Sequence, residues 1–173
     1  MSERLRFGTA GLRGALGEGP NRMNNEVVWQ AATAVARWLP SESLVIIGND
    51  ARHGSADFAR VSARVLIDAG HRVQLFDRVV PTPVVAYAVG RSDAAAGIMV
   101  TASHNPAADN GYKVYADDGG QILPDAAHAI EAIMDELVWP DEVDVSMPDG
   151  VEFLADESID AYVDQIMRPP VDE

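Results

Sequence analysis

The sequence Ile-Met-Val-Thr-Ala-Ser-His-Asn-Pro at residues 98–106 begins as an apolar run and changes to small and polar residues before a proline. Its apolar part continues back to Ala95, which predicts a short buried strand over 95–100. A strand that ends in this way presents a hydroxyl, an imidazole and a carboxamide together, at a sheet edge where catalytic groups are commonly found. The sequence therefore predicts both a central strand and a candidate functional loop.

Apolar residues on either side of this stretch recur with the spacing of helices and strands. Helical spacing covers residues 27–39, 56–69, 82–89, 124–137 and 156–167, and β-rich runs cover 44–48, 73–76, 95–100 and 111–116. Alternating strands and helices are typical of an α/β domain with right-handed crossovers. We expect a single domain over 1–173, with 111–116 as an antiparallel edge strand and with a loop at 139–150 that is rich in proline, aspartate and glycine.

The composition limits the classes of protein that this chain can represent. A length of 173 residues suits one domain with a real hydrophobic core. The absence of cysteine excludes structural disulfides and thiolate metal sites. Because the chain has neither a charged-then-apolar leader nor an apolar stretch near ~18 residues, we expect a cytoplasmic protein without a membrane partner.

The net charge of −14 is distributed unevenly along the chain. Residues 1–116 carry 12 basic and 10 acidic side chains, whereas residues 117–173 carry 17 acidic side chains and one basic side chain, Arg168. Such an acidic segment repels nucleic acid, which is therefore not an expected partner, and it otherwise serves as a solvated surface. The candidate loop lies in the half that is not acidic, where an anionic substrate can approach.

Two cations stand out near this loop. Arg13 lies in the glycine-rich stretch Phe7–Gly14, and Lys113 is the only lysine in a chain with twelve arginines. An arginine fork suits phosphate oxygens, and a lysine offers a compact charge with a tunable proton. The alternative for the stretch that carries Arg13 is a simple glycine turn, and the alternative for Lys113 is a surface lysine without a function.

Ser103 is the candidate nucleophile, although serines in loops more often only satisfy the backbone. The adjacent His104 does not suit a serine-hydrolase pair, because neighbouring side chains point apart in extended structure, and no Gly-x-Ser-x-Gly elbow is present. A serine that stores a phosphoryl group depends less on a permanent base. It requires cations, donors and a hard metal ion to hold the dianion.

Taken together, these segments resemble the phosphohexomutase superfamily, the phosphoglucomutases and phosphomannomutases. The likeness rests on the serine loop Thr101–Pro106, the opening Phe7–Gly14 and the lysine segment Asn110–Tyr115, with further support from Gly48–Arg52 and Pro81–Pro83. It implies the N-terminal phosphoserine domain of that superfamily, a three-layer α/β/α domain with a mixed, mostly parallel sheet.

The resemblance also implies roles for individual residues. Phosphorylated Ser103 would donate its phosphoryl group to a sugar phosphate and take one back from a bisphosphate intermediate, and this phosphate would ligate Mg²⁺. Arg13 and Lys113 would assist proton transfer and bind the transferring group, with His104 donating to substrate or phosphate. The reaction would interconvert the 1-phosphate and the 6-phosphate of glucose or mannose, with a pentose phosphate as the alternative substrate. A sugar 1,6-bisphosphate would be the activator.

Two further residues, Arg52 and Thr9, are expected to support the loops rather than to act on substrate. Members of the superfamily have four domains, and the Asp-Gly-Asp-x-Asp-Arg loop that completes their magnesium site does not occur in this sequence. A final helix over 156–167 followed by Pro169-Pro170 indicates a junction to a second domain. We therefore expect the isolated chain to have little turnover. The alternative is a non-catalytic sugar-phosphate-binding or regulatory module.

Overall fold

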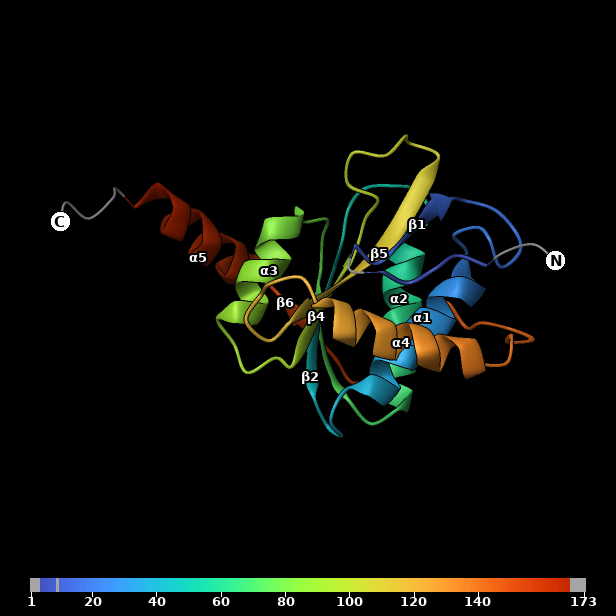
Figure 1. The fold of residues 1–173 in the computed structure, drawn as a ribbon. Helices are drawn as coiled ribbons and strands as arrows, with labels where there is room; N and C mark the ends of the chain where they lie inside the picture. The colour runs from blue at the N-terminus through green and yellow to red at the C-terminus, as the bar shows by residue number, and fades with distance from the viewer. Residues whose placement is uncertain (1–3, 9, 169–173) are drawn as a thin grey trace.

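A six-stranded sheet in the order β1-β5-β4-β2-β3-β6 carries the fold (Figure 1). The computed structural model describes residues 4–8 and 10–168. Its strands are β1 (Leu12–Ala15), β2 (Leu44–Asn49), β3 (Arg72–Phe76), β4 (Ala96–Val100), β5 (Asp109–Ala116) and β6 (Val151–Leu154). Its helices are α1 (Asn25–Trp38), α2 (Ser55–Asp68), α3 (Thr82–Gly90), α4 (Pro124–Glu136) and α5 (Asp156–Met167).

The sheet is mixed, as expected from the sequence. Strands β4, β2, β3 and β6 pair in parallel, while β5 pairs antiparallel with both β4 and β1. Helices connect the parallel strands because such strands cannot be joined by a short hairpin. Figure 1 shows α1, α2 and α4 on one side of the sheet and α3 with α5 on the other. The predicted three-layer α/β/α architecture is confirmed.

Strand β2 explains why two layers of helices are needed. All six of its residues are buried, with Val45 and Ile47 packed in the larger core under α1 and α2, and Leu44 and Ile46 in the smaller core under α3. Because both faces are covered, the strand reads as a continuous apolar run rather than as an alternating one. Full burial of one such side chain contributes about 1.5–3 kcal/mol relative to leaving it exposed.

The helix ends follow the local sequence closely. The side chain of Asn24 accepts a hydrogen bond from the amide of Val27 at 2.9 Å and thereby caps α1. At the other end of this helix, Leu39 already has extended backbone angles, and it precedes Pro40, which disfavours helical geometry for its neighbour. The cap of this helix is therefore Asn24, and the adjacent Asn25 is its first residue.

Three expectations about the sheet need correction. Residues 111–116 do not form an edge strand, because β1 pairs along the outer side of β5. Strand β1 was not expected, since three of its four residues lie in the glycine-rich stretch Phe7–Gly14, which suggested only a turn. Strand β6 was not expected either, because it is short and its Glu152 and Phe153 are exposed.

The order of the strands creates a crevice at one end of the sheet. From β2 the chain passes through α2 to β3 on one side, and from β3 it returns through α3 to β4 on the other side of β2. The carboxyl ends of β2 and β4 are therefore the point at which the direction of winding reverses, where ligands bind in open α/β sheets. Residues 50–53 and 101–108 lie side by side at this place.

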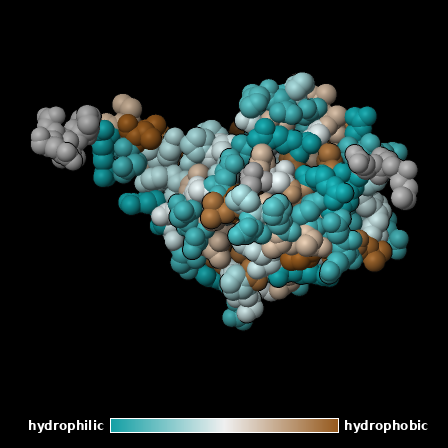
Figure 2. All heavy atoms as spheres, viewed as in Figure 1, coloured by the Kyte–Doolittle hydropathy of each residue, from teal (hydrophilic) through white to brown (hydrophobic). Residues whose placement is uncertain are grey.

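The surface seen in Figure 2 is largely hydrophilic, with apolar residues in scattered groups. Helix α5 projects from the body of the domain, and its Val163, Ile166 and Met167 are exposed (Figure 1). Among the described residues, none of the helices has both the length and the apolar character needed to cross a bilayer.

Candidate active site

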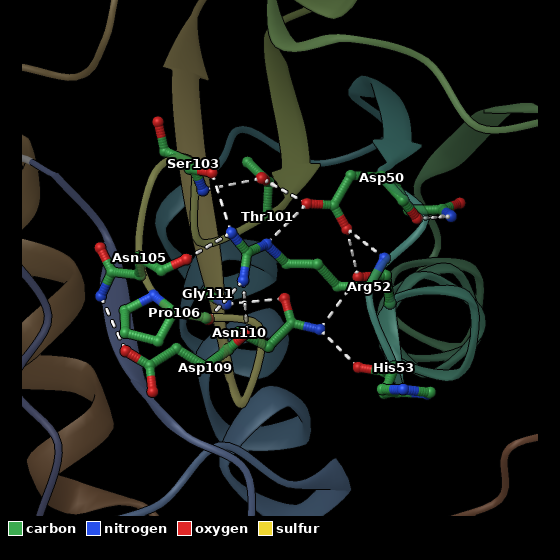
Figure 3. Close-up of polar contacts among 12 residues, drawn as sticks. Asp50, Arg52, His53, Thr101, Ser103, Asn105, Pro106, Asp109, Asn110 and Gly111 are labelled. Atoms are coloured by element: carbon green, nitrogen blue, oxygen red, sulfur yellow. Dashed lines mark hydrogen bonds and ion pairs between the residues drawn. The ribbon is translucent and has the colours of Figure 1, made fainter.

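The serine loop leaves β4 with an unusual backbone at its central residue. Ser103 has a φ of +60°, in the left-handed region that residues with a Cβ rarely adopt. Its amide donates to Oγ1 of Thr101 at 2.9 Å, and its side chain is exposed. In Figure 3 the hydroxyl points away from the polar contacts beneath the loop. The loop therefore presents this hydroxyl outward on a backbone that is held from below.

The guanidinium of Arg52 holds the loop from beneath (Figure 3). Its two terminal nitrogens donate four hydrogen bonds of 2.7–3.0 Å to backbone carbonyl oxygens, those of Ser103, Asn105, Pro106 and Asp109. Its Nε lies 3.2 Å from Oδ2 of Asp50. The terminal nitrogens of this arginine are thus occupied by carbonyl oxygens, and its Nε lies against a carboxylate. The expected supporting role of Arg52 agrees with this geometry.

Asp50 joins the ends of the two strands at the crevice. It follows β2, and its Oδ2 accepts a hydrogen bond of 2.6 Å from the hydroxyl of Thr101, which follows β4. Its Oδ1 accepts from the amide of Arg52 at 2.9 Å and from the hydroxyl of Ser55 at 2.7 Å. Both carboxylate oxygens are therefore engaged within the protein.

A buried asparagine fixes the start of β5 against α2. The side chain of Asn110 is fully buried; it donates to the carbonyl of His53 and to the hydroxyl of Ser55, both at 2.9 Å, and it accepts from the amide of Gly111 at 2.7 Å. A buried amide of this kind is stable only when its donors and acceptor are satisfied. Asn110 thereby ties the strand that carries Lys113 to the helix that follows Arg52.

Arg13 and Lys113 lie on the same face of neighbouring strands. Arg13 on β1 stands opposite Gly111 on β5, so Lys113 is its diagonal neighbour, within reach for long side chains. Lys113 is only 6% exposed. Burial lowers its pKa below the ordinary value, and the nearby positive charge of Arg13 lowers it further. Among the described residues, neither side chain forms an ion pair with a carboxylate.

The absence of a side chain at Gly111 lets the stem of Arg13 lie beside the start of the serine loop. The amide of Thr101 donates to the carbonyl of Gly111 at 3.0 Å. A Cβ on Gly111 would lie 2.6 Å from the carbonyl oxygen of Thr101 and 3.2 Å from Cγ of Arg13. Only glycine therefore allows the arginine stem to pass beside the start of the loop.

The remaining predicted residues differ in their surroundings. His104 is exposed next to Ser103, and the structure shows no polar partner for its ring within residues 4–8 and 10–168. Thr9 and the Pro169-Pro170 pair lie outside the described residues. The catalytic assignments of Ser103, His104, Lys113 and Arg13 stay predictions. Of the residues that organise the loop, Asp50, Thr101 and Asn110 were not singled out from the sequence, although each lies within a quoted motif.

Few side chains near the serine loop are available as ligands for a metal ion. Within the part of the chain that the structure describes, no three histidine or acidic side chains are grouped to bind one. The carboxylate of Asp50, beneath the serine loop, is already occupied by Thr101, Ser55 and Arg52. These residues alone therefore do not fit Mg²⁺, which prefers a full octahedral set of oxygen ligands.

The fold is a doubly wound α/β domain whose serine loop follows the central strand β4 at the switch point of the sheet. The family profile described as "Phosphoglucomutase/phosphomannomutase, alpha/beta/alpha domain I" matches residues 4–140. The chain belongs to this family, as its first domain.

Individual relatives agree with this assignment. The chain is 44% identical over 147 residues to "Probable phosphomannomutase" of Haemophilus influenzae, covering 82% of this chain and 30% of the relative. It is 40% identical over 169 residues to the "Phosphopentomutase" of Homo sapiens, covering 90% of this chain and 28% of the relative. A crystal structure from Thermus thermophilus that carries a phosphomannomutase name superposes with a TM-score of 0.80 and 34% identity, over 95% of this chain and 36% of that one.

The chain therefore spans about a third or less of the length of these relatives. Its match to domain I agrees with the resemblance drawn from the serine, arginine and lysine segments. The relatives' greater length supports the expectation that further domains accompany this one.

Proposed function

We propose that this chain is the phosphoserine-bearing domain of a phosphosugar mutase, which interconverts the 1-phosphate and 6-phosphate of glucose or mannose, or the corresponding phosphates of a pentose, through a bisphosphate intermediate. The observation that carries the proposal is the exposed hydroxyl of Ser103, held outward on a left-handed backbone at the end of β4, with Arg13 and Lys113 on the adjoining strands β1 and β5. The relatives' names, phosphomannomutase and phosphopentomutase, support a sugar phosphate as the substrate class.

In the proposed reaction the bond between Oγ of Ser103 and phosphorus breaks while a sugar hydroxyl forms the new bond to phosphorus, and the proton that this hydroxyl gives up is balanced by the proton that Oγ of Ser103 takes up. The transition state of such a transfer is loose, so the protein contributes mainly placement and charge stabilisation. Arg13 offers two parallel donors to the phosphoryl oxygens. Lys113, whose pKa is lowered, exchanges its proton more readily than an ordinary lysine. His104, next to Ser103, would donate to the substrate or to the phosphate.

Mg²⁺ and a sugar 1,6-bisphosphate belong to this proposal as metal ion and activator. The phosphate on Ser103 is the one metal ligand that we propose from this chain, and the other ligands would come from the remaining domains. The bisphosphate would load Ser103 with its first phosphoryl group. On this proposal the isolated chain shows little turnover, because most of the sugar and metal contacts lie elsewhere in the protein.

Phosphoryl labelling of the protein that includes the remaining domains tests this proposal. We expect glucose 1,6-bisphosphate with Mg²⁺ to add one phosphoryl group, located at Ser103 by intact mass and peptide mapping. Ser103→Ala should abolish the label, while Ser41→Ala, which changes an exposed turn serine outside the site, should keep it. If neither this bisphosphate nor its mannose and pentose counterparts ever label Ser103, the chain is a binding module and the proposal fails.

A further inference from the structure

A closed ring of polar contacts begins and ends on the backbone of Ser103 (Figure 3). The amide of Ser103 donates to Thr101, whose hydroxyl donates to Asp50. The same oxygen of Asp50 lies 3.2 Å from Nε of Arg52, and Arg52 donates back to the carbonyl of Ser103 at 2.9 Å. Both polar backbone groups of the serine are therefore held by side chains that meet at a single carboxylate.

This ring accounts for the left-handed backbone of Ser103. A residue with a Cβ does not favour positive φ, so the surrounding structure must impose this conformation. The hydroxyl of Ser103 takes no part in the ring and points away from it (Figure 3). The ring therefore fixes where the hydroxyl stands and leaves its oxygen free to react.

Arg52 is poorly suited to bind a substrate phosphate. Its two terminal nitrogens already donate to four carbonyl oxygens, its Nε lies 3.2 Å from Asp50, and its side chain is only 16% exposed. The carboxylate of Asp50 also offsets its charge. A lysine at this position has three donors on one atom and cannot span four carbonyls and a carboxylate.

We propose that Arg52, together with Asp50 and Thr101, is a positioning device that orients the Ser103 hydroxyl for phosphoryl transfer. This inference rests on the proposed function, in which Ser103 carries the phosphoryl group. Arg52 acts through the loop backbone and touches neither the sugar nor the phosphate. Breaking the ring allows Ser103 to relax to negative φ, which moves its oxygen away from the line of transfer.

The test is the rate at which Ser103 acquires its phosphoryl group from glucose 1,6-bisphosphate in the complete protein. For Arg52→Lys we expect the labelling rate and kcat to fall on the order of 100-fold, as misplacement of a reacting atom by about 1 Å does. We expect KM for the sugar phosphate to change by less than about twofold, since no uniform binding contact is lost. The exposed Arg72, paired with Asp93, supplies the control Arg72→Lys, which should label at the parent rate.

A second position keeps the test decisive if Arg52→Lys does not fold. Thr101→Val removes the hydroxyl that joins Ser103 to Asp50, and Thr101→Ser restores it. We expect the valine variant to lose labelling and the serine variant to regain it, with folding monitored by circular dichroism and by amide exchange at Ser103.

The outcomes separate this role from the proposed function. If Ser103 is never labelled in the parent protein, both the proposed function and the positioning role of Arg52 are wrong. If the parent is labelled and the folded Arg52→Lys and Thr101→Val variants are labelled at the same rate, only the positioning role is wrong. A rise in KM without a fall in kcat shows that Arg52 binds phosphate directly, which contradicts the positioning role. A loss of labelling that only follows the unfolded fraction of the variant contradicts it as well.

Discussion

The turn before β1 provides the sharpest test of how the sequence builds this site. Gly11 has a φ of +74°, and a Cβ at this position would lie 1.8 Å from the carbonyl oxygen of Tyr112 on β5. In Gly11→Ala the left-handed backbone costs about 1–2 kcal/mol. The turn must also withdraw from β5, which weakens the 2.7 Å hydrogen bond from Gly11 to the carbonyl of Gly8, worth about 1 kcal/mol. We expect a total destabilisation of about 2–3 kcal/mol.

Gly8, in the same turn, is the matched control. Apart from its chain neighbours, no atom of the described residues lies within 4 Å of a Cβ built on Gly8, and its φ is not positive. Gly8→Ala removes the same unfolded-state entropy as Gly11→Ala, so we expect its stability to stay within about 0.5 kcal/mol of the parent. Only the local conformation and the clash with β5 differ between the two variants.

Urea denaturation of the chain and its two variants measures this difference. For a chain of this size, about 2–3 kcal/mol corresponds to a decrease in Tm of about 4–12 °C. Two alanine variants that differ by less than about 1 kcal/mol would refute the reasoning, because the turn would then tolerate a side chain against β5. Since β1 carries Arg13, we also expect Gly11→Ala to slow labelling of Ser103 in the complete protein.

Three further perturbations test other parts of the argument. Because Lys113 is the only lysine, NMR titration of its ammonium should give one signal with a pKa below the ordinary value of about 10.4. The unfolded chain then holds this proton more tightly, so stability should rise with pH between the folded pKa and about 10.4, and Lys113→Met should remove that rise in denaturation series. Asn24→Ala removes the cap of α1 and should cost about 1 kcal/mol by urea denaturation, whereas an unchanged midpoint would show that the cap contributes nothing. Glu131 accepts from the amide of Phe7 at 2.6 Å and pairs with Arg4, so Glu131→Gln should increase amide exchange over residues 4–8, and unchanged protection would contradict this.

Local patterns in the sequence were sufficient for the central strands and the helices. The runs at 44–48 and 95–100 are apolar because both faces of these strands are covered, and in 73–76 the apolar residues Val73, Leu75 and Phe76 are buried around the half-buried Gln74. Strand β1 differs, since only Leu12 among its residues is fully buried, and its extended form results from pairing with β5. Strand β6 is defined in the same way by β3. Pairing between distant segments leaves no local periodicity.

The same distinction applies to the site. Ser103, Arg13 and Lys113 were selected because their side chains bear chemistry. Arg52 instead acts by donating hydrogen bonds to four backbone carbonyls. Every residue has a backbone carbonyl, so the sequence does not indicate which carbonyls accept these bonds. Asp50 likewise gains its role from meeting Thr101 across two strands. A supporting role was expected for Arg52, but the backbone contacts through which it acts become visible only once the loop is folded.

The two arginines near Ser103 show how partners decide what a charge can do. Arg52 faces Asp50 and carbonyl dipoles, so its charge is compensated whether or not a ligand is present. Arg13 lies beside Lys113 without a recorded acid in the described residues, and its charge lowers the pKa of that lysine. Two adjacent cations destabilise the free domain, and an anion placed between them relieves that repulsion. On the proposed function, Arg52 sets the shape of the loop while the uncompensated pair Arg13 and Lys113 binds phosphate, and reversible phosphoryl transfer at Ser103 would require this division.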